Sequence, residues 1–462
     1  MIENWHKLRV TVMGLGRFGG GVGVVRWLSR QGARVLVTDQ ADHHRLGYSL
    51  QRIADCDVEL RLGGHEERDF TDTDLVVVNP AIPEANPYLQ AARAAGVPIT
   101  TEINLFVQRC PALTVGVTGS VGKSTVTAMI GHVLERVAPQ RRTWVGGNIG
   151  RSLLEVLEKI DERDYVVLEL SSFQLARTPL VRWSPNVAVI TNIAPNHLDW
   201  HGTFAAYLAA KLGIVRYQDP ERDSIVAGDQ PELLHHFDLM FGDLAGIWRF
   251  GLDGEVPVAV QQSTPAVDCD DRKLRWEGLE LRVPGRHNRV NAACALTVAA
   301  ALGHDPRACC AALAGFAGLP HRLQAVAEID GVAYYDDSKS TTPEAALTAM
   351  ASFERPLLLI LGGYDKGSDL SELAETAARR ARFTACLGQT GPGLVQRICA
   401  AGGAAELYES LADAVAACRA RARAGDVVLL SPGCASWDMF VDYRERGRRF
   451  AELLGAAASS PH

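Results

Sequence analysis

The chain has 462 residues, of which 47% are hydrophobic and 22% charged, and its formal net charge at pH 7 is −7. The composition is that of a soluble globular protein, the length predicts about three domains, and the acidic balance argues against a general nucleic-acid-binding protein. The ten cysteines form no C-x-x-C pair, so we expect reduced thiols. The N-terminus carries no secretory signal and no apolar run is long enough to span a bilayer, so we expect a cytoplasmic protein without membrane insertion.

The first hundred residues predict a small doubly wound domain. A strand over Leu8–Met13 leads into Gly14-Leu15-Gly16-Arg17-Phe18-Gly19 and a helix to Arg30, and a second strand from Arg34 ends at Asp39. A G-x-G-x-x-G turn between strand and helix, with an acid after the next strand, is the dinucleotide-binding fingerprint. The same turn can hold any pyrophosphate, so NAD is one open interpretation.

A second glycine-rich turn starts the next predicted domain. The segment Thr118–Thr125, Thr-Gly-Ser-Val-Gly-Lys-Ser-Thr, lies between a strand over Ala112–Val117 and a helix over Ser124–Val137. Such a turn directs backbone N–H groups at a phosphate, Lys123 adds positive charge, and Ser124 offers its hydroxyl to Mg²⁺. The first glycine of the strict phosphate-loop pattern falls on Val117, so the loop is a shortened form; a lysine-containing turn without a nucleotide is the alternative.

Polar residues follow the predicted strands of this domain at the edge where ligands of α/β sheets bind. Glu169 ends an apolar strand, where a carboxylate needs a partner, and is a candidate Mg²⁺ ligand or a structural acid. His197 follows the strand Asn186–Ile190 and is either a second metal ligand or a surface histidine. Asn148 lies in a glycine-rich loop, and Lys211 is an unexplained cation among apolar residues.

The remainder of the chain predicts a third α/β domain. Residues 219–281 indicate short, variable elements without a recognisable functional motif. Asn288 or Asn291, at the start of an alanine-rich helix, is either a helix cap or an adenine contact. Strands over Gly331–Tyr335, Pro356–Leu361 and Asp426–Leu430 each deliver polar residues at their carboxyl ends. We therefore expect domains at residues 1–109, 110–317 and 318–462.

Taken together, these motifs resemble the ordered signature of the Mur ligases of peptidoglycan synthesis over essentially the whole chain. The segments that carry the resemblance are Thr118–Thr125, Gly147–Gly150, Glu169–Gln174, Asn192–His197, Lys211, His287 and Asn288 with Asn291, and His321 with Arg322. The resemblance implies an α/β protein of three domains: an N-terminal Rossmann-like domain that binds UDP, a central P-loop ATPase-type domain and a C-terminal Rossmann-like domain. Arg17 and Phe18 depart from the family, which has a small or hydroxyl residue after the second glycine.

Three loops of the last domain resemble those of the family members that add D-glutamate to UDP-N-acetylmuramoyl-L-alanine: Asp337–Thr341, Gly362–Gly367 and Ser431–Ser436. The implied reaction uses ATP and Mg²⁺ to convert the L-alanyl carboxylate into an acyl phosphate, which the amine of glutamate attacks. The Asp-Asn-Pro-Arg-type loop of diaminopimelate-adding relatives is not seen. We expect small-molecule substrates, no nucleic-acid partner and a monomer.

The resemblance also implies roles for individual residues. Lys123, Lys211, His197 and Glu169 are the implied catalytic residues, and the lysine matching Lys211 is carbamylated in the family. Those implied for metal are Ser124, Glu169, His197 and Lys211, and those for ATP are Gly119, Ser120, Gly122, Lys123, Ser124, Thr125, Asn291, Arg322 and Asp337. Those implied for the other substrates are Gly14, Leu15, Gly16, Arg17, Asp39, Asn148, Ser171, Lys339, Thr341, Lys366, Ser436 and Tyr443.

Three alternatives stay open at this point. A folylpolyglutamate-type ligase shares the ATP-binding motifs but does not need the N-terminal βαβ domain. An NAD-dependent dehydrogenase leaves the phosphate loop and Lys211 unexplained. A nucleotide-sensing module leaves the candidate metal ligands unexplained.

Overall fold

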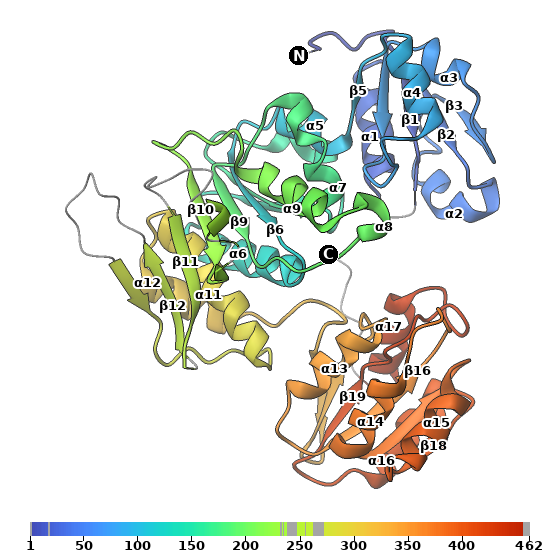
Figure 1. Ribbon diagram of the computed structural model, residues 1–462, viewed down its shortest axis with the longest axis vertical. Coiled ribbons are helices and arrows are strands. Elements are labelled where there is room, and N and C mark those ends of the chain that lie inside the picture. Colours follow the sequence, from blue (N-terminus) through green and yellow to red (C-terminus); the bar gives the residue numbers. More distant parts are fainter. Residues whose placement is uncertain are drawn as a thin grey trace. The chain divides into compact units, whose positions relative to one another are not determined.

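The computed structural model describes residues 2–16, 19–231, 233, 235–237, 247–254, 256–261 and 272–455. Its strands form three sheets of five, eight and six strands, and helices lie beside each of them (Figure 1). The predicted α/β class with three sheet domains is therefore confirmed.

The N-terminal sheet is entirely parallel, in the order β3-β2-β1-β4-β5. Its direction of winding reverses between β1 and β4, which makes the carboxyl ends of these two strands the ligand-binding edge. Gly21 is required by packing in α1, because a Cβ there would lie 2.3 Å from the carbonyl oxygen of Leu15. The elements are β1 (Arg9–Met13), α1 (Gly20–Arg30), β2 (Arg34–Asp39), α2 (His43–Gln51), β3 (Val58–Leu62), α3 (Arg68–Thr71), β4 (Leu75–Val78), α4 (Pro87–Ala94), β5 (Ile99–Thr100) and α5 (Glu102–Val107).

The central sheet has the order β13-β12-β11-β10-β9-β6-β8-β7, with β6 paired to both β8 and β9. Its helices and 3-10 turns are α6 (Lys123–Val137), η1 (Leu153–Lys159), α7 (Ser172–Leu175), η2 (Thr178–Val181), α8 (Leu198–His201), α9 (Phe204–Leu212), η3 (Gly213–Val215), α11 (Arg286–Ala301) and α12 (Pro306–Ala314). Its strands are β6 (Leu113–Thr118), β7 (Thr143–Gly147), β8 (Tyr165–Glu169), β9 (Val187–Ile190), β10 (Ser224–Gly228), β11 (Ile247–Asp253), β12 (Val256–Gln261) and β13 (Arg272–Arg275).

The region of residues 219–281, where the sequence indicates only short and variable elements, supplies β10 to β13. Strands β10 and β11 extend the parallel part of the central sheet, and β12 pairs antiparallel with both β11 and β13.

The C-terminal sheet has the order β14-β15-β19-β16-β17-β18, and only its edge strand β14 pairs antiparallel. Apolar side chains are buried on both of its faces, as expected for a sheet covered by helices. The elements are β14 (Gln324–Ile329), β15 (Val332–Asp336), α13 (Pro343–Ala351), β16 (Leu357–Gly362), α14 (Ser371–Arg380), β17 (Ala381–Leu387), α15 (Gly391–Ala400), β18 (Ala405–Leu407), α16 (Leu411–Arg421), β19 (Val427–Leu430) and α17 (Tyr443–Leu453).

Contacts divide the chain into two compact units. One comprises Met1–Gly278 with Val290–Leu313, and the other Leu279–Arg289 with Ala314–His462. The first unit thus contains both the N-terminal and the central sheet, while the domain boundaries near residues 109 and 317 stay predictions. Within the described part of the chain, no helix combines the length and hydrophobicity needed to cross a membrane, and the cysteines there are free thiols.

Candidate active site

The segment Gly119–Lys123 forms a tight turn between β6 and α6, as predicted. Gly119 and Gly122 have φ angles of 145° and 83°, which side chains other than glycine rarely adopt. Contacts require the glycines as well, because a Cβ at Gly119 would lie 2.0 Å from Thr191 Oγ1 and one at Gly122 would lie 2.7 Å from Asn291 Oδ1. The fold therefore brings Asn291, from α11, against the turn that the sequence assigned to phosphate.

Side chains around the turn hold it in shape. Lys123 Nζ donates to the carbonyl oxygens of Gly119 and Ser120 at 2.9 and 3.0 Å. Ser120 is engaged inside the protein, because its backbone N–H donates to Asn192 O and its hydroxyl contacts Ala194 O and Tyr207 Oη at 2.8 Å. Ser124 and Thr125, in the first turn of α6, are half-buried. The helix N-terminus, Lys123 and these hydroxyls make this turn the part of the domain best suited to a phosphate.

Glu169 is a buried carboxylate at the carboxyl end of β8, with 2% of its surface exposed. It pairs in register with Val117 of β6, the strand that leads into the turn. Asn148 Nδ2 donates to Glu169 Oε1 at 2.9 Å, whereas Glu169 Oε2 is buried without a hydrogen-bond partner. A buried, unpartnered carboxylate oxygen is costly unless another group completes its environment.

Lys211 extends from α9 to the same turn. Its Nζ donates to Gly119 O at 2.8 Å and to Thr118 Oγ1 at 3.2 Å, and it lies 4.9 Å from the ring centre of Tyr207. Burial, together with the positive charge of Lys123, lowers the pKa of Lys211 from 10.5 to about 7, although Glu169 opposes the shift. A large fraction of this amine is therefore neutral, and nucleophilic, near pH 7.

His197 lies before α8 with a φ of 51°, a strained conformation for a residue with a side chain. Burial and the charge of Lys123 lower the pKa of His197, so its imidazole is neutral at pH 7. Phe173 contacts both His197 and His201, with ring centres 4.9 and 5.7 Å apart. His201 Nε2 lies 2.9 Å from Ser172 Oγ. The sequence predicts no role for Phe173, which lies within the motif Glu169–Gln174, or for His201, which lies four residues after the motif that ends at His197.

These groups fit a magnesium ion. Mg²⁺ prefers oxygen ligands and is usually held by one or two carboxylates, hydroxyls, waters and the phosphates of a nucleotide. Glu169 Oε2 is the unpartnered oxygen that such an ion would satisfy, and Ser124 supplies the hydroxyl. No group of three or more histidines, cysteines, aspartates or glutamates that could hold a metal occurs among the described residues, so the phosphates would have to complete the site.

The glycine-rich turn after β1 is held in place by Asp39, the acid at the end of β2. Asp39 Oδ2 accepts from Gly16 N at 3.2 Å and Asp39 Oδ1 from Ala41 N at 2.8 Å. Gly14 and Gly16 have φ angles of 89° and 64°, and the side chain of Leu15 is buried in the core with 1% exposed. This turn therefore offers a ligand its backbone groups rather than the side chains of Asp39 or Leu15. Arg17 lies outside the described residues.

Ser171 and Asp337, two predicted site residues, are engaged within the protein. Ser171 forms a capping box with Gln174 at the start of α7. Asp337 Oδ2 accepts from Ser340 Oγ at 2.5 Å and Ser431 Oγ at 2.7 Å. Burial raises the pKa of Asp337 to about 6, although these hydroxyl donors oppose the shift. Asp337 thus ties together two loops at the carboxyl ends of β15 and β19.

A buried arginine holds the same edge of the C-terminal sheet. Arg446 has no exposed surface and donates to Ser338 O at 2.8 Å and to Cys434 O at 3.2 Å. Next to it, Lys339 Nζ donates to Tyr443 Oη at 3.1 Å. Burial favours the neutral phenol, but the positive charges of Lys339 and Arg444 and their hydrogen bonds together outweigh it and lower the pKa of Tyr443.

A small cavity follows the carboxyl end of β16 and is lined by Thr341, Lys366, Thr390 and Cys434, among others. Lys366 Nζ lies 4.7 Å from the ring centre of Trp437. Ser436 is buried with 2% exposed and does not line this cavity, and Arg322, half-buried, lies in the segment before β14. The cavity therefore joins two of the predicted glutamate-binding residues, Thr341 and Lys366.

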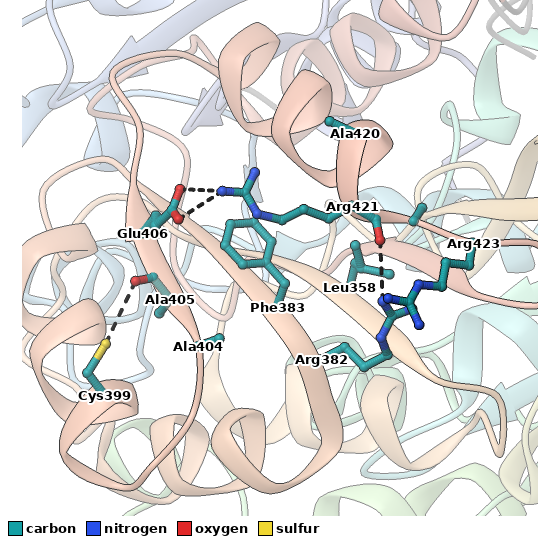
Figure 2. A pocket seen from close by; sticks show the side chains of 11 residues that line it. Leu358, Arg382, Phe383, Cys399, Ala404, Ala405, Glu406, Ala420, Arg421 and Arg423 are labelled. Atoms are coloured by element: carbon teal, nitrogen blue, oxygen red, sulfur yellow. Dashed lines mark hydrogen bonds and ion pairs between the residues drawn. The ribbon is translucent and has the colours of Figure 1, made fainter.

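A larger cavity of about 610 Å³ lies elsewhere in the same domain, at the amino ends of β16, β17 and β18 (Figure 2). Arg421 lies 4.2 Å from the ring centre of Phe383 and donates to both carboxylate oxygens of Glu406 at 2.8 and 2.9 Å. Arg382 pairs with Asp426. This cavity is at the end of the sheet opposite to the predicted site and holds none of its residues.

Family models match all three domains. The Mur ligase MurD-like N-terminal domain matches residues 8–101, the Mur ligase middle domain 117–299 and the Mur ligase glutamate ligase domain 321–434. Full-length relatives named UDP-N-acetylmuramoylalanine–D-glutamate ligase include one from Pelotomaculum thermopropionicum, 36% identical over 98% of this chain and 99% of the relative. Another, from Roseiflexus sp., is 37% identical over 96% and 98%.

The chain belongs to the Mur ligase family. It is an ATP-dependent ligase that forms amide bonds. The alternative interpretations as an NAD-dependent dehydrogenase or a nucleotide-sensing module are therefore wrong.

Solved structures agree with this fold. UDP-N-acetylmuramate-alanine ligase from Thermotoga maritima covers 97% of this chain with a TM-score of 0.60 and 23% identity. The MurF ligase of the same organism, in complex with ADP, covers 98% with a TM-score of 0.52 and 17% identity. At these identities the likeness shows the Mur ligase fold alone.

Proposed function

We propose that this Mur ligase joins D-glutamate to UDP-N-acetylmuramoyl-L-alanine in a reaction driven by ATP and Mg²⁺. The full-length similarity to ligases of that printed name carries the proposal. The closeness of Lys366 and Thr341 supports the amino-acid assignment, because a cation and a threonine hydroxyl suit the side-chain carboxylate of glutamate. We place the reaction in the cytoplasm and assign it to the monomer.

The proposed chemistry has two steps. The L-alanyl carboxylate attacks the γ-phosphorus of ATP, so that ADP leaves and an acyl phosphate forms. The glutamate amine then attacks the carbonyl carbon, loses a proton, and expels inorganic phosphate. The reactants are anions, so charge neutralisation and alignment are the main tasks of the protein.

Each proposed role draws on the geometry around the phosphate turn. Lys123 and the N-terminus of α6 face the phosphates, and Asn291 contacts the nucleotide from beside Gly122. Mg²⁺, when bound, would neutralise charge on the transferred phosphate, held by Ser124 and Glu169. His197, neutral at pH 7, is the proposed ligand of a second ion, and it contacts the muramoyl substrate together with Asn148.

We propose that Lys211 is carbamylated. Its neutral amine attacks CO₂, a nitrogen–carbon bond forms and a proton leaves to solvent, which gives a carboxylate-like group near the metal ligands. The lowered pKa of Lys211 supports this step, because an ordinary lysine is almost entirely protonated at pH 7.

Phosphate release from ATP and Mg²⁺ in the presence of UDP-N-acetylmuramoyl-L-alanine tests the proposal, with D-glutamate, L-glutamate or no amino acid added. We expect release that requires both substrates and prefers D-glutamate. A preference for L-glutamate would keep the ligase and overturn the acceptor. Release that ignores the muramoyl nucleotide would overturn the role of the N-terminal domain.

A further inference from the structure

Two side chains of the central domain bind consecutive carbonyl groups of one N-terminal loop. The loop, residues 79–84, follows β4 at the ligand-binding edge of the N-terminal sheet. Arg177 Nη2 donates to Ile82 O at 2.6 Å, and Trp200 Nε1 donates to Ala81 O at 2.9 Å. All of these residues lie in the same compact unit.

Arg177 is an unusual residue for this place. Only 1% of it is exposed, although a guanidinium is rarely buried without full pairing. Its Nη1 forms an ion pair with Glu84 Oε1 at 2.9 Å, and its backbone carbonyl accepts from Asn104 Nδ2 at 2.9 Å. Burial and the charge of Arg93 lower the pKa of Arg177 to about 10, so the guanidinium is still charged at pH 7. Burying this charge costs free energy, and the hydrogen bond to Ile82 O and the ion pair with Glu84 offset part of it, since Arg177 Nε has no hydrogen-bond partner.

The other side of the loop contacts the turn that the proposed function assigns to the pyrophosphate. A Cβ at Gly14 would lie 3.1 Å from Asn79 Cβ and 3.7 Å from Ile82 Cδ1, and one at Gly16 would lie 3.4 Å from Asn79 Nδ2. Asn79 N also donates to Met13 O at 3.0 Å. A displacement of the loop would therefore displace the nucleotide-binding turn.

Trp200 links the loop to the catalytic edge as well. It lies in α8, three residues after His197, and its ring centre is 5.0 Å from that of Phe173 and 4.5 Å from that of His201. Phe173 in turn contacts His197. One side chain thus touches both the N-terminal loop and the aromatic cluster around the proposed metal ligand.

We propose that Arg177 and Trp200 are positioning residues that fix the N-terminal nucleotide-binding turn relative to His197. The inference rests on the proposed function, in which one substrate spans from this turn to the phosphate-transfer site. Arg177 and Trp200, together called the clamp, set the distance between the two sites that bind the ends of that substrate. Its loss weakens binding of the muramoyl nucleotide and leaves binding of ATP unchanged.

Trp200→Phe is the primary test, because it removes the indole N–H and keeps an aromatic ring. We expect the KM for UDP-N-acetylmuramoyl-L-alanine to rise about two- to tenfold, the effect of one lost hydrogen bond, with the KM for ATP unchanged. Arg177→Met should raise it further, by about tenfold or more, if the variant folds. Gln31→Ala is the matched control, since Gln31 Nε2 bonds Glu158 Oε1 between the same two domains but away from the loop.

Calorimetric binding of the muramoyl nucleotide separates this inference from the proposed function. If the wild-type protein binds the muramoyl nucleotide and Trp200→Phe binds it more weakly, the clamp is supported even if D-glutamate is not the acceptor. Equal binding by wild type, Trp200→Phe and Gln31→Ala overturns the clamp. If Trp200→Phe weakens the binding of ATP and of the muramoyl nucleotide equally, the role of Trp200 is merely structural and the clamp is overturned. If the wild-type protein binds no muramoyl nucleotide, the clamp and the proposed function are overturned together.

Discussion

Replacing Lys211 by methionine should stabilise the protein at acidic pH and abolish its activity. Lowering the pKa of the buried amine from 10.5 to about 7 disfavours its protonated form by roughly 5 kcal/mol. Methionine removes this cost and also loses two hydrogen bonds, worth about 1 kcal/mol each. The acceptors keep other partners, because Gly119 O still accepts from Lys123 and Thr118 Oγ1 still bonds Leu170 O.

The expected effect depends on pH. Because the pKa of Lys211 is lower in the folded state, the unfolded chain binds more protons between pH 7 and 10.5, and wild-type stability rises with pH across that window. At pH 6 both states are protonated, so the variant gains about 2 to 3 kcal/mol, roughly 5 °C in the melting temperature of a domain of this size. By about pH 9 the advantage should vanish, since roughly 3 kcal/mol of the wild-type penalty is gone.

Thermal unfolding at pH 6 and pH 9, in buffer depleted of CO₂, is the assay. Lys159→Met provides the control, because Lys159 is exposed, and it should show no such dependence on pH. A Lys211→Met variant that loses the same stability at both pH values would refute the argument from burial.

Four further substitutions test the site. Lys123→Ala should reduce turnover by about a hundredfold or more, measured as phosphate release, because a cation at the transferred phosphate is lost. Lys211→Ala should be nearly inactive and partly rescued by small carboxylates; the absence of any rescue would contradict carbamylation. Glu169→Gln should raise the Mg²⁺ concentration for half-maximal rate about tenfold or more. Lys366→Met should raise the KM for D-glutamate about tenfold or more and leave that for ATP unchanged, and an equal rise in both would count against the assigned cavity.

Much of the fold could be predicted from local patterns. The strand before the phosphate turn and the helix after it lie within one residue of their expected bounds, because an apolar run, two glycines and a helical period agree there. Strands β10 to β13 escaped prediction because residues 219–281 show no such agreement. Three of these four strands, β11, β12 and β13, pair antiparallel one after another, and strand preference depends more on contacts with neighbouring strands than on local sequence.

The candidate site was predictable where burial conflicts with charge. Glu169 and Lys211 were both flagged as ionisable residues among apolar ones, and both are buried beside the phosphate turn. Ser120 and Asp337 were assigned to nucleotide, but their polar atoms bond within the protein, which no spacing could reveal. Arg177 escaped notice because its partners come from a loop almost a hundred residues away in the chain.

The fate of oxygen in the muramoyl substrate tests the central claim most directly. UDP-N-acetylmuramoyl-L-alanine labelled with ¹⁸O in both carboxylate oxygens is turned over with ATP, Mg²⁺ and D-glutamate, and the released phosphate is examined by mass spectrometry. An acyl phosphate transfers one labelled oxygen to phosphate and leaves the other in the new amide, so singly labelled phosphate is the predicted result. Unlabelled phosphate, released in step with amide formation, would contradict the account.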